Sequence, residues 1–200
     1  MIRAEHGDVG AAGCKGTLTR QRGREAIGGN AIPRRAAVGR LENHVWIGTT
    51  ASRVLRSADG GRSWAIAGTP VATGNATGIF SIAFKDAQHG VVVGGDYTKE
   101  SQAGDNAAFT SDGGATWTLG KGISGFRSVA AWVPGSGRWL AIGPAGADWS
   151  MDDGQTWTPA PVTTVAGVPA GFDTFSLAPG TTVGWASGSG GRIAKLSISK

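Results

Sequence analysis

The sequence predicts an all-β protein built from similar four-stranded units, and three observations lead to this prediction. A motif typical of tight turns occurs three times, and short strand-like runs recur at regular intervals around it. In the composition, 35 of the 200 residues are glycine and 8 are tryptophan, and the glycines follow no three-residue period. Residues 41–200 nowhere sustain the 3.6-residue period of a helix. Repeated β-hairpins therefore account for the chain better than a helical or a collagen-like fold.

The repeated motif follows the pattern Ser/Thr-x-Asp-x-Gly-x-Ser/Thr-Trp, with 53 and then 40 residues between successive aspartates. Its specified positions include Ser57, Asp59, Gly61, Trp64, Thr110, Asp112, Gly114, Trp117, Ser150, Asp152, Gly154 and Trp157. An aspartate in a tight turn accepts hydrogen bonds from nearby backbone N–H groups, and glycine adopts positive φ without strain. The motif therefore predicts a hairpin turn beside which a tryptophan ring packs. The alternative is a carboxylate cluster for metal or substrate; the structural role is favoured because the copies belong to different units.

Short apolar runs that end in glycine recur along the chain, at His44–Gly48, Gly90–Gly94, Trp139–Gly143 and Val183–Gly188. Alternating runs precede the last three of them, at Phe80–Phe84, Phe126–Trp132 and Phe172–Leu177. Such alternation is typical of strands. In the second unit, the four expected strands are Phe80–Phe84, Gly90–Gly94, Ala107–Thr110 and Thr116–Leu119. Four strands in a unit of about 40 to 50 residues are typical of a β-propeller blade.

The units begin near residues 36, 78, 125 and 172, and the fourth ends with its third strand at Arg192–Ser197. The sequence therefore predicts a β-propeller of about four four-stranded blades, of which the last lacks its outer strand. Since unpaired sheet edges are templates for association, an open arc of blades is expected to self-associate through them.

The charge divides the chain into a basic segment, residues 1–40, and a neutral propeller region, residues 41–200. The basic segment contains eight Lys or Arg against three Asp or Glu and carries the whole net charge of +5. It contains no aromatic residue, because the first in the chain is Trp46. Such a segment buries too little apolar surface to offset its ordering entropy, so we expect it to be poorly ordered. Its scattered arginines and lack of stacking aromatics argue against a nucleic-acid partner.

The repeated motif resembles the Asp-box, or bacterial neuraminidase repeat, of sialidase-type propellers. The segment Gly78–Gly90, followed by Val93-Gly94-Gly95-Asp96-Tyr97, is similar to the photosystem II stability/assembly factor-like group. This resemblance covers about residues 41–200. It implies that the motif copies lie at the propeller periphery, away from any active site, and that full-length relatives have about six or seven blades. The chain is thus expected to be the C-terminal part of such a protein, and a non-functional truncated copy is one alternative.

The residues favour a non-catalytic scaffold for a protein or ligand over a sialidase-type glycoside hydrolase. The resemblance to sialidases would imply an arginine triad, a Tyr–Glu nucleophile pair and an acid/base aspartate. Tyr97 is the only tyrosine, and Glu100 lies three positions from it, where a pair from separate blades is not expected. The family's Arg-Ile-Pro motif is absent. Arg127, Arg138 and Arg192 are candidates for a carboxylate clamp, although solvated turns or strand ends are the favoured interpretation.

The insertion Asp96–Asp105 between two inner strands is the candidate binding loop. It explains the 53-residue spacing between the first two motif copies. Propeller function usually resides on such loops because the blades form a rigid support. The candidate contact residues are Asp96, Tyr97, Lys99, Glu100 and Asp105. The alternative is an irregular, solvated loop without a binding role.

No catalytic residue, metal site or cofactor is expected. The histidines His6, His44 and His89 show no ligand spacing, and the single cysteine, Cys14, has no neighbouring histidine. Gly188–Gly191 is read as a hairpin turn, because neither Lys-Ser/Thr nor a helix follows it as in a phosphate loop. No apolar run approaches the roughly 18 residues of a membrane helix. No apolar signal region follows Met1, although related full-length proteins are often exported, so localisation is left open.

Overall fold

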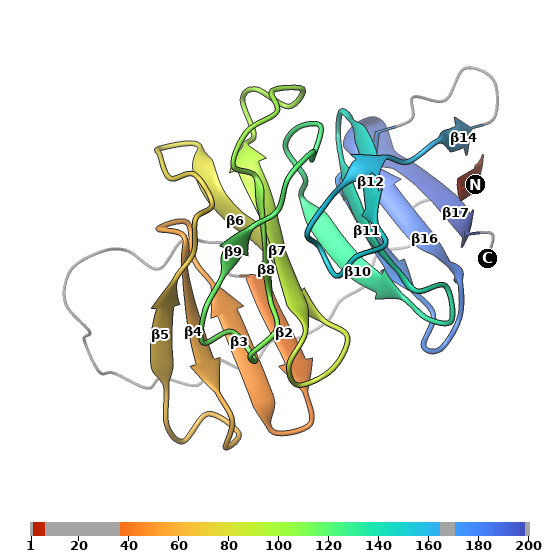
Figure 1. Ribbon diagram of the computed structural model, residues 1–200. Coiled ribbons are helices and arrows are strands. Elements are labelled where there is room, and N and C mark those ends of the chain that lie inside the picture. The colour runs from red at the N-terminus through yellow and green to blue at the C-terminus, as the bar shows by residue number, and fades with distance from the viewer. Residues whose placement is uncertain (1, 7–36, 165–170, 199–200) are drawn as a thin grey trace, which may run out of the picture.

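The computed structural model describes residues 2–6, 37–164 and 171–198, which form four sheets arranged one after another as propeller blades (Figure 1). In every blade, consecutive strands of the chain pair antiparallel. The first strands of neighbouring blades lie against one another in chain order. The predicted all-β propeller architecture is confirmed.

Blades 1 and 2 are four-stranded meanders, and the candidate binding loop connects the second and third strands of blade 2. Blade 1 contains β2 (Ala37–Leu41), β3 (His44–Gly48), β4 (Arg53–Ser57) and β5 (Ala65–Gly68). Blade 2 contains β6 (Thr77–Phe84), β7 (Gly90–Asp96), β8 (Ala107–Thr110) and β9 (Thr118–Leu119). The alternating and apolar runs of the second unit therefore form the strands that the sequence predicts.

Blade 3 repeats this arrangement, whereas the sheet of blade 4 combines strands from three separate parts of the chain. Blade 3 contains β10 (Val129–Val133), β11 (Arg138–Gly143), β12 (Gly146–Ser150) and β13 (Thr158–Pro159). Blade 4 contains β15 (Thr174–Leu177), β16 (Val183–Gly188) and β17 (Arg192–Ile198), with the 3-10 turn η1 (Ser189–Gly191) between the last two. The order of its sheet is β14-β1-β17-β16-β15.

A strand from the start of the sequence is the fourth strand of blade 4, and a strand that follows blade 3 extends the sheet at its outer edge. β1 (Ile2–His6) pairs antiparallel with β17, with Ile2 opposite Ile198, and β14 (Val162–Thr164) pairs parallel with β1. The fourth unit itself ends with its third strand, as predicted. Of the basic segment 1–40, the structure describes β1 and the start of β2; residues 7–36, with Cys14, lie outside the described residues.

The first strands of blades 3 and 4 begin later than the sequence indicates. β10 begins at Val129, three residues after the predicted start, because the backbone N–H of Arg127 donates to the Gly94 carbonyl of blade 2 (3.0 Å). β15 begins at Thr174, two residues after its predicted start, and the N–H of Phe172 donates to the Gly143 carbonyl of blade 3 (3.3 Å). Each run thus first connects two blades and then enters its own sheet.

The core lies between adjacent blades, because the facing sides of neighbouring sheets pack against one another. We call the face of a blade that contacts the following blade its leading face, and the opposite face its trailing face. Trp46, Val91 and Leu140 occupy the same leading-face position in blades 1, 2 and 3, in the ladder pair that precedes each repeated turn. They are 1%, 0% and 1% exposed. The following blade covers this position in every case.

The apolar runs end in glycine because neighbouring chain segments approach there. A Cβ on Gly48 would lie 2.6 Å from the side chain of Ile79 in blade 2. A Cβ on Gly143 would lie 3.2 Å from the Cα of Arg127. Both distances are shorter than an ordinary van der Waals contact, so larger residues would push the inner strands apart.

Candidate functional site

The three copies of the motif form one kind of turn, which we call the repeated turn (residues 57–64, 110–117 and 150–157). In each copy the aspartate Oδ1 accepts a hydrogen bond of 2.8 Å from the first hydroxyl, and Oδ2 accepts one of 2.6 Å from the second. The backbone N–H four residues after the aspartate donates to Oδ1 at 2.9 Å. The glycines have the expected positive φ, at 90° for Gly61, 84° for Gly114 and 88° for Gly154. Each carboxylate is therefore held by groups of its own turn.

These hydrogen bonds favour the ionised carboxylates. For Asp112, burial acts to raise the pKa, but hydrogen bonds from Thr116 and Thr110 outweigh it and lower the pKa to about 2. For Asp59, hydrogen bonds from the Ser63 hydroxyl and N–H, and from Ser57, hold the pKa far below its usual range. The pKa of Asp152 is lowered against its burial by the same kind of bonds.

We expect the repeated turns to make the fold acid-sensitive. A lowered folded-state pKa gives stability that is present above about pH 4 and is lost as the pH falls toward about 2. A Thr116→Val variant should lose about 1 kcal/mol at neutral pH and show a weaker dependence on pH over this range, because its Asp112 titrates nearer the unfolded value. Urea unfolding at several pH values measures both effects. Thr181→Val is the control, because the hydroxyl that it removes donates to backbone carbonyls and not to a carboxylate. The pH dependence of its stability should match that of the wild type. Equal pH profiles for the wild type and both variants would contradict the prediction.

The tryptophans of the repeated turns do not pack alike. Trp157 is 3% exposed and lies in the core between blades 2 and 3, as expected. Trp117 is half-buried and packs against the cluster of blades 1 and 2. Trp64 is 43% exposed, so the expected packing against the fold does not hold for it. The reason is that Trp64 belongs to blade 1, on whose trailing side the described residues place no further blade.

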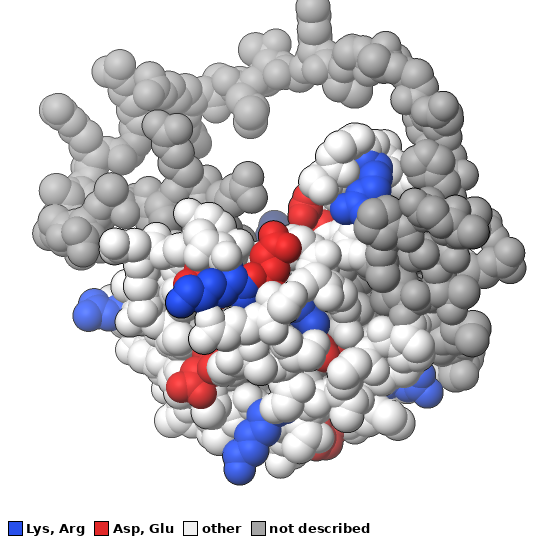
Figure 2. Space-filling view, turned by 90° about the horizontal axis from the view of Figure 1, so that it is seen from above, with Lys and Arg blue, Asp and Glu red and all other residues white. Residues whose placement is uncertain are grey.

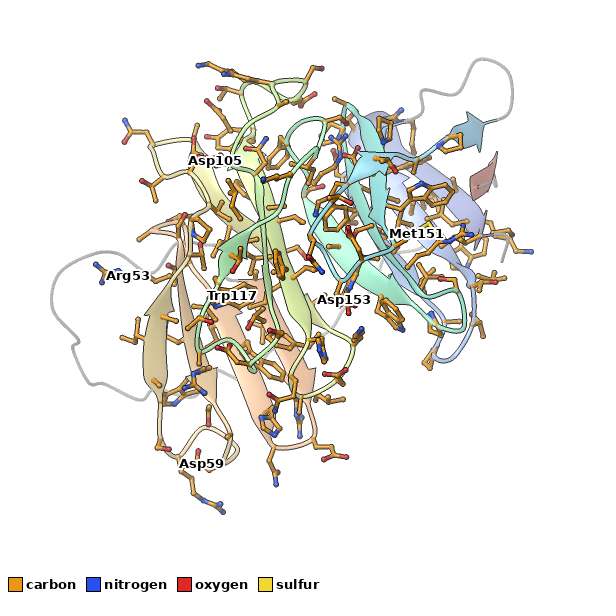
Figure 3. All side chains as sticks on the ribbon, viewed as in Figure 1. Arg53, Asp59, Asp105, Trp117, Met151 and Asp153 are labelled. Carbon is orange, nitrogen blue, oxygen red and sulfur yellow. The ribbon has the colours of Figure 1, made fainter. Side chains whose placement is uncertain are left out.

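The candidate binding loop lies at the other end of the blades from the repeated turns. β8 enters from this loop and leaves through a repeated turn, so the two features flank one strand. Figure 3 shows the same separation, with Asp105 at the upper end of the molecule and Asp59 at the lower end. Residues 97–105 are exposed. The candidate binding loop and the repeated turns therefore occupy opposite ends of the blades.

Buried and backbone groups hold the candidate binding loop in place. Asn106 is 5% exposed, and its Nδ2 donates to the Gln102 carbonyl (3.0 Å) while its own carbonyl accepts from Gly94 N–H (2.8 Å). Asp96 caps the start of the loop by accepting from the N–H (2.9 Å) and the hydroxyl (2.6 Å) of Thr98, which lower its pKa. The loop is therefore an ordered platform, and Asp96 is engaged in maintaining its shape.

An aromatic row connects this loop to blade 3. A β-bulge in β6 takes Phe80 out of the ladder, because Ile79 pairs with Gly94 and Ser81 with Val93. The Phe80 ring makes edge-to-face contacts with Tyr97 (6.0 Å between centroids) and Phe126 (4.8 Å). Bulges commonly re-aim a side chain next to a functional site. Tyr97 is 51% exposed, so the row ends in an accessible ring.

Phe126 is in turn fixed by a buried ion pair beneath the loop. Arg127 Nε donates to Asp148 Oδ2 (2.7 Å), and both side chains are at most 2% exposed. Ser124 also donates to Asp148 Oδ2, through its N–H (3.2 Å) and its hydroxyl (3.1 Å). Burial lowers the pKa of Arg127 and Asp148 opposes that shift. The interpretation of Arg127 as a solvated residue is thus wrong, because the segment 124–128 crosses between blades and turns this side chain inward.

The arginines considered for a carboxylate clamp have separate partners. The Arg138 guanidinium lies over the Trp149 ring (5.0 Å) and that of Arg192 over the Phe172 ring (5.6 Å). Arg127 pairs with Asp148, as described above.

Two histidines also have partners within the fold. His89 Nδ1 lies 2.9 Å from Asp86, and His44 stacks on Trp46. The described part of the chain contains no group of three or more His, Cys, Asp or Glu side chains that could hold a metal.

The surface at the loop end carries both signs of charge. We call the residues 96–106 and 120–128 together the loop surface. Lys99, Glu100 and Asp105 are exposed there. Figure 2, which looks down on this end, shows acidic and basic side chains next to one another. The loop surface is therefore a mixed polar surface around an accessible aromatic ring.

Within residues 2–6, 37–164 and 171–198, no helix is long and apolar enough to cross a membrane.

The fold has counterparts among solved structures. No protein-family model and no curated protein sequence matches the chain. The chain is similar to YCF48 bound to a D1 peptide, with 17% identity and a TM-score of 0.50, over 80% of this chain and 48% of that one. It is similar to an ancestral GH74 enzyme (19% identity, TM-score 0.51, 80% and 22% covered) and to the computationally designed Ika4 protein (12%, 0.54, 89% and 100%). The chain spans less than half of the YCF48 chain and under a quarter of the GH74 enzyme. These likenesses establish that the chain consists of β-propeller blades.

Proposed function

We propose that this protein is a non-catalytic, assembly-factor-like scaffold whose loop surface binds a peptide segment of a partner protein. The observation that carries the proposal is the aromatic row, in which the exposed Tyr97 ring packs against Phe80 and Phe80 in turn packs against Phe126. An accessible aromatic side chain on a rigid support is the usual anchor of a protein interface. The support is rigid because the buried Arg127–Asp148 pair fixes the segment that carries Phe126.

Two further observations fit a peptide ligand. Lys99 and Glu100 follow Tyr97 closely in the exposed loop and carry opposite charges, which suits the mixed polarity of a peptide backbone and its side chains. In the structurally similar YCF48, the bound molecule is a D1 peptide. The repeated turns at the other end of the blades resemble the Asp-box, and their carboxylates already accept hydrogen bonds within each turn.

Tyr97→Ser should weaken binding of selected peptides by about tenfold or more, because it removes the central anchor. The experiment selects peptides from a displayed random library with the wild-type protein and then measures their dissociation constants. The deletion of Thr98–Gly104 should abolish binding. Met151→Ser removes an even more exposed apolar side chain from a repeated turn and should leave binding unchanged. Unchanged binding in both loop variants would overturn the proposal.

The enzyme alternative is tested on the same preparations. The likeness to a GH74 enzyme makes glycosidic bonds the substrate class to examine. Fluorogenic glycosides should remain intact if the protein is a scaffold. For a sialoside the structure adds a reason, since Arg127, a candidate for the clamp on its carboxylate, is buried and paired with Asp148. Hydrolysis that disappears with the deletion of Thr98–Gly104 would assign an enzyme to this surface in place of a scaffold.

A further inference from the structure

Blade 1 and blade 4 leave complementary faces exposed at the two ends of the arc. We infer that a second copy of this chain covers them head to tail, with Trp185 of one copy seated on the repeated turn of residues 57–64 of the other. This contact would repeat one that already exists within the chain, between blades 1 and 2. It is independent of the loop surface and of peptide binding.

The internal contact shows what such a tryptophan needs. Trp46, on the leading face of blade 1, is buried by blade 2, and its Nε1 donates to the carbonyl of Gly113 in the next repeated turn (2.8 Å). Its ring stacks on Phe84, with 3.6 Å between centroids and 9° between planes. A Cβ on Gly114 would lie 3.3 Å from the Trp46 ring, so the glycine provides the space for it.

Trp185 occupies the corresponding place on blade 4. Both tryptophans are the third residue of their apolar run, and both stand opposite a basic residue of the third strand, Arg56 for Trp46 and Lys195 for Trp185. The neighbour of Trp185 in β16, Ala186, is buried against blade 3, so Trp185 points to the leading side. Trp185 is 55% exposed, whereas its three equivalents are covered by a following blade. The leading face of blade 4 therefore presents an unused interblade anchor.

The trailing face of blade 1 offers the matching turn. The N–H of Gly60 donates to the Asn43 carbonyl at 2.9 Å, as the N–H of Gly113 does to Gln88 at 2.9 Å. The φ angles of Gly60 and Gly113 are 74° and 72°, so the two turns present their carbonyls in the same way. Where blade 2 has Phe84, blade 1 has the exposed Arg40, whose guanidinium can stack on an indole ring. The acceptor and the stacking partner of a tryptophan are thus both present.

An apolar row surrounds this turn. The directly paired residues Val38, Ile47, Leu55 and Ile66 share the trailing face of blade 1. Their equivalents in blade 2, Ile82, Val92 and Ala108 among them, are buried against blade 1. In blade 1 the exposed fractions of Val38 and Ile66 are 60% and 62%. The row has the chemistry of an interblade core without its covering blade.

A second copy of this chain is the partner that fits both exposed faces. Each chain carries one half of the contact on blade 4 and the other half on blade 1. A head-to-tail interface generates a ring if its rotation closes. Two chains of four blades would make two identical contacts and leave no uncovered blade face. Each contact would also bury the apolar row of one copy and Trp185 of the other, in keeping with the apolar cores of stable homodimers.

The test measures molar mass by light scattering during gel filtration. The wild type should have the mass of two chains of 20.2 kDa. Trp185→Asp and Ile66→Asp should each raise the dissociation constant about tenfold or more, with the native fold kept, because both side chains are exposed within one chain. Met151→Asp, at 70% exposure on blade 3, is the matched control and should remain a dimer.

Mixing the two variants distinguishes head-to-tail pairing from other modes. Trp185→Asp keeps an intact trailing face and Ile66→Asp an intact leading face, so an equimolar mixture should form a two-chain species that neither variant forms alone. A monomeric wild type, a species of any other size, or a mixture that stays monomeric would overturn the inference.

Discussion

Replacing Arg127 by methionine is expected to lower the free energy of unfolding by about 3–5 kcal/mol, because it leaves a buried charge without its partner. The Asp148 side chain is fully buried, and its Oδ2 accepts hydrogen bonds from Arg127 and Ser124. Its Oδ1 has no hydrogen-bond partner among the described residues, so without Arg127 only the neutral Ser124 donors to Oδ2 would remain. Urea unfolding followed by tryptophan fluorescence measures the loss.

Two further variants separate this cause from lost packing. The double variant Arg127→Met/Asp148→Leu should recover most of the stability, because replacing both partners of a buried pair by apolar groups is often neutral. Arg53→Met removes an exposed arginine and should stay within about 0.5 kcal/mol of the wild type. A single Arg127→Met variant as stable as Arg53→Met would contradict the role assigned to the pair.

Replacing Trp46 by alanine is expected to cost about 3–5 kcal/mol, the range for large aromatic side chains in a core. The ring fills the interface of blades 1 and 2, stacks on Phe84 and donates to the Gly113 carbonyl. Trp46→Phe keeps a ring and loses the hydrogen bond, so about 1 kcal/mol of the effect should remain. Thermal and urea unfolding measure both values.

Trp185→Ala is the matched control for this prediction. It has the same place in its blade but no covering neighbour, so at a dilution where the chain is monomeric it should change stability by less than about 0.5 kcal/mol. Similar losses for Trp46→Ala and Trp185→Ala would show that blade contacts do not determine the stability of these positions.

The strands could be predicted because their signal is local. Alternation in Phe80–Phe84 and the glycine-rich turn after Thr110 each follow from neighbours in the sequence, and the structure places both as expected. The loop-surface geometry depends on distant residues. Nothing near Arg127 indicates that Asp148 will bury it, and no local pattern marks Phe80 as the bulged residue.

The tryptophans illustrate the same limit. Trp64 and Trp157 occupy equal positions of one motif, yet only Trp157 is buried. The difference lies in which blade stands beside each turn, and this depends on the order of blades in the whole arc. Composition likewise does not predict the pairing of β1 with β17, because backbone hydrogen bonds alone can form a strand within a basic, glycine-rich segment.

The pairing of β1 with β17 also has a consequence for synthesis on the ribosome. Blades 1 to 3 take all their strands from continuous stretches of chain, so each has its own pairing partners soon after it emerges. Ile2 pairs with Ile198, so β1 can take its place in the sheet only after β17 has been made. Such long-range pairings form slowly, since their loop-closure entropy comes before their contacts. Blade 4 is therefore the last blade to complete its sheet, and one edge of β17 stays unpaired until β1 reaches it.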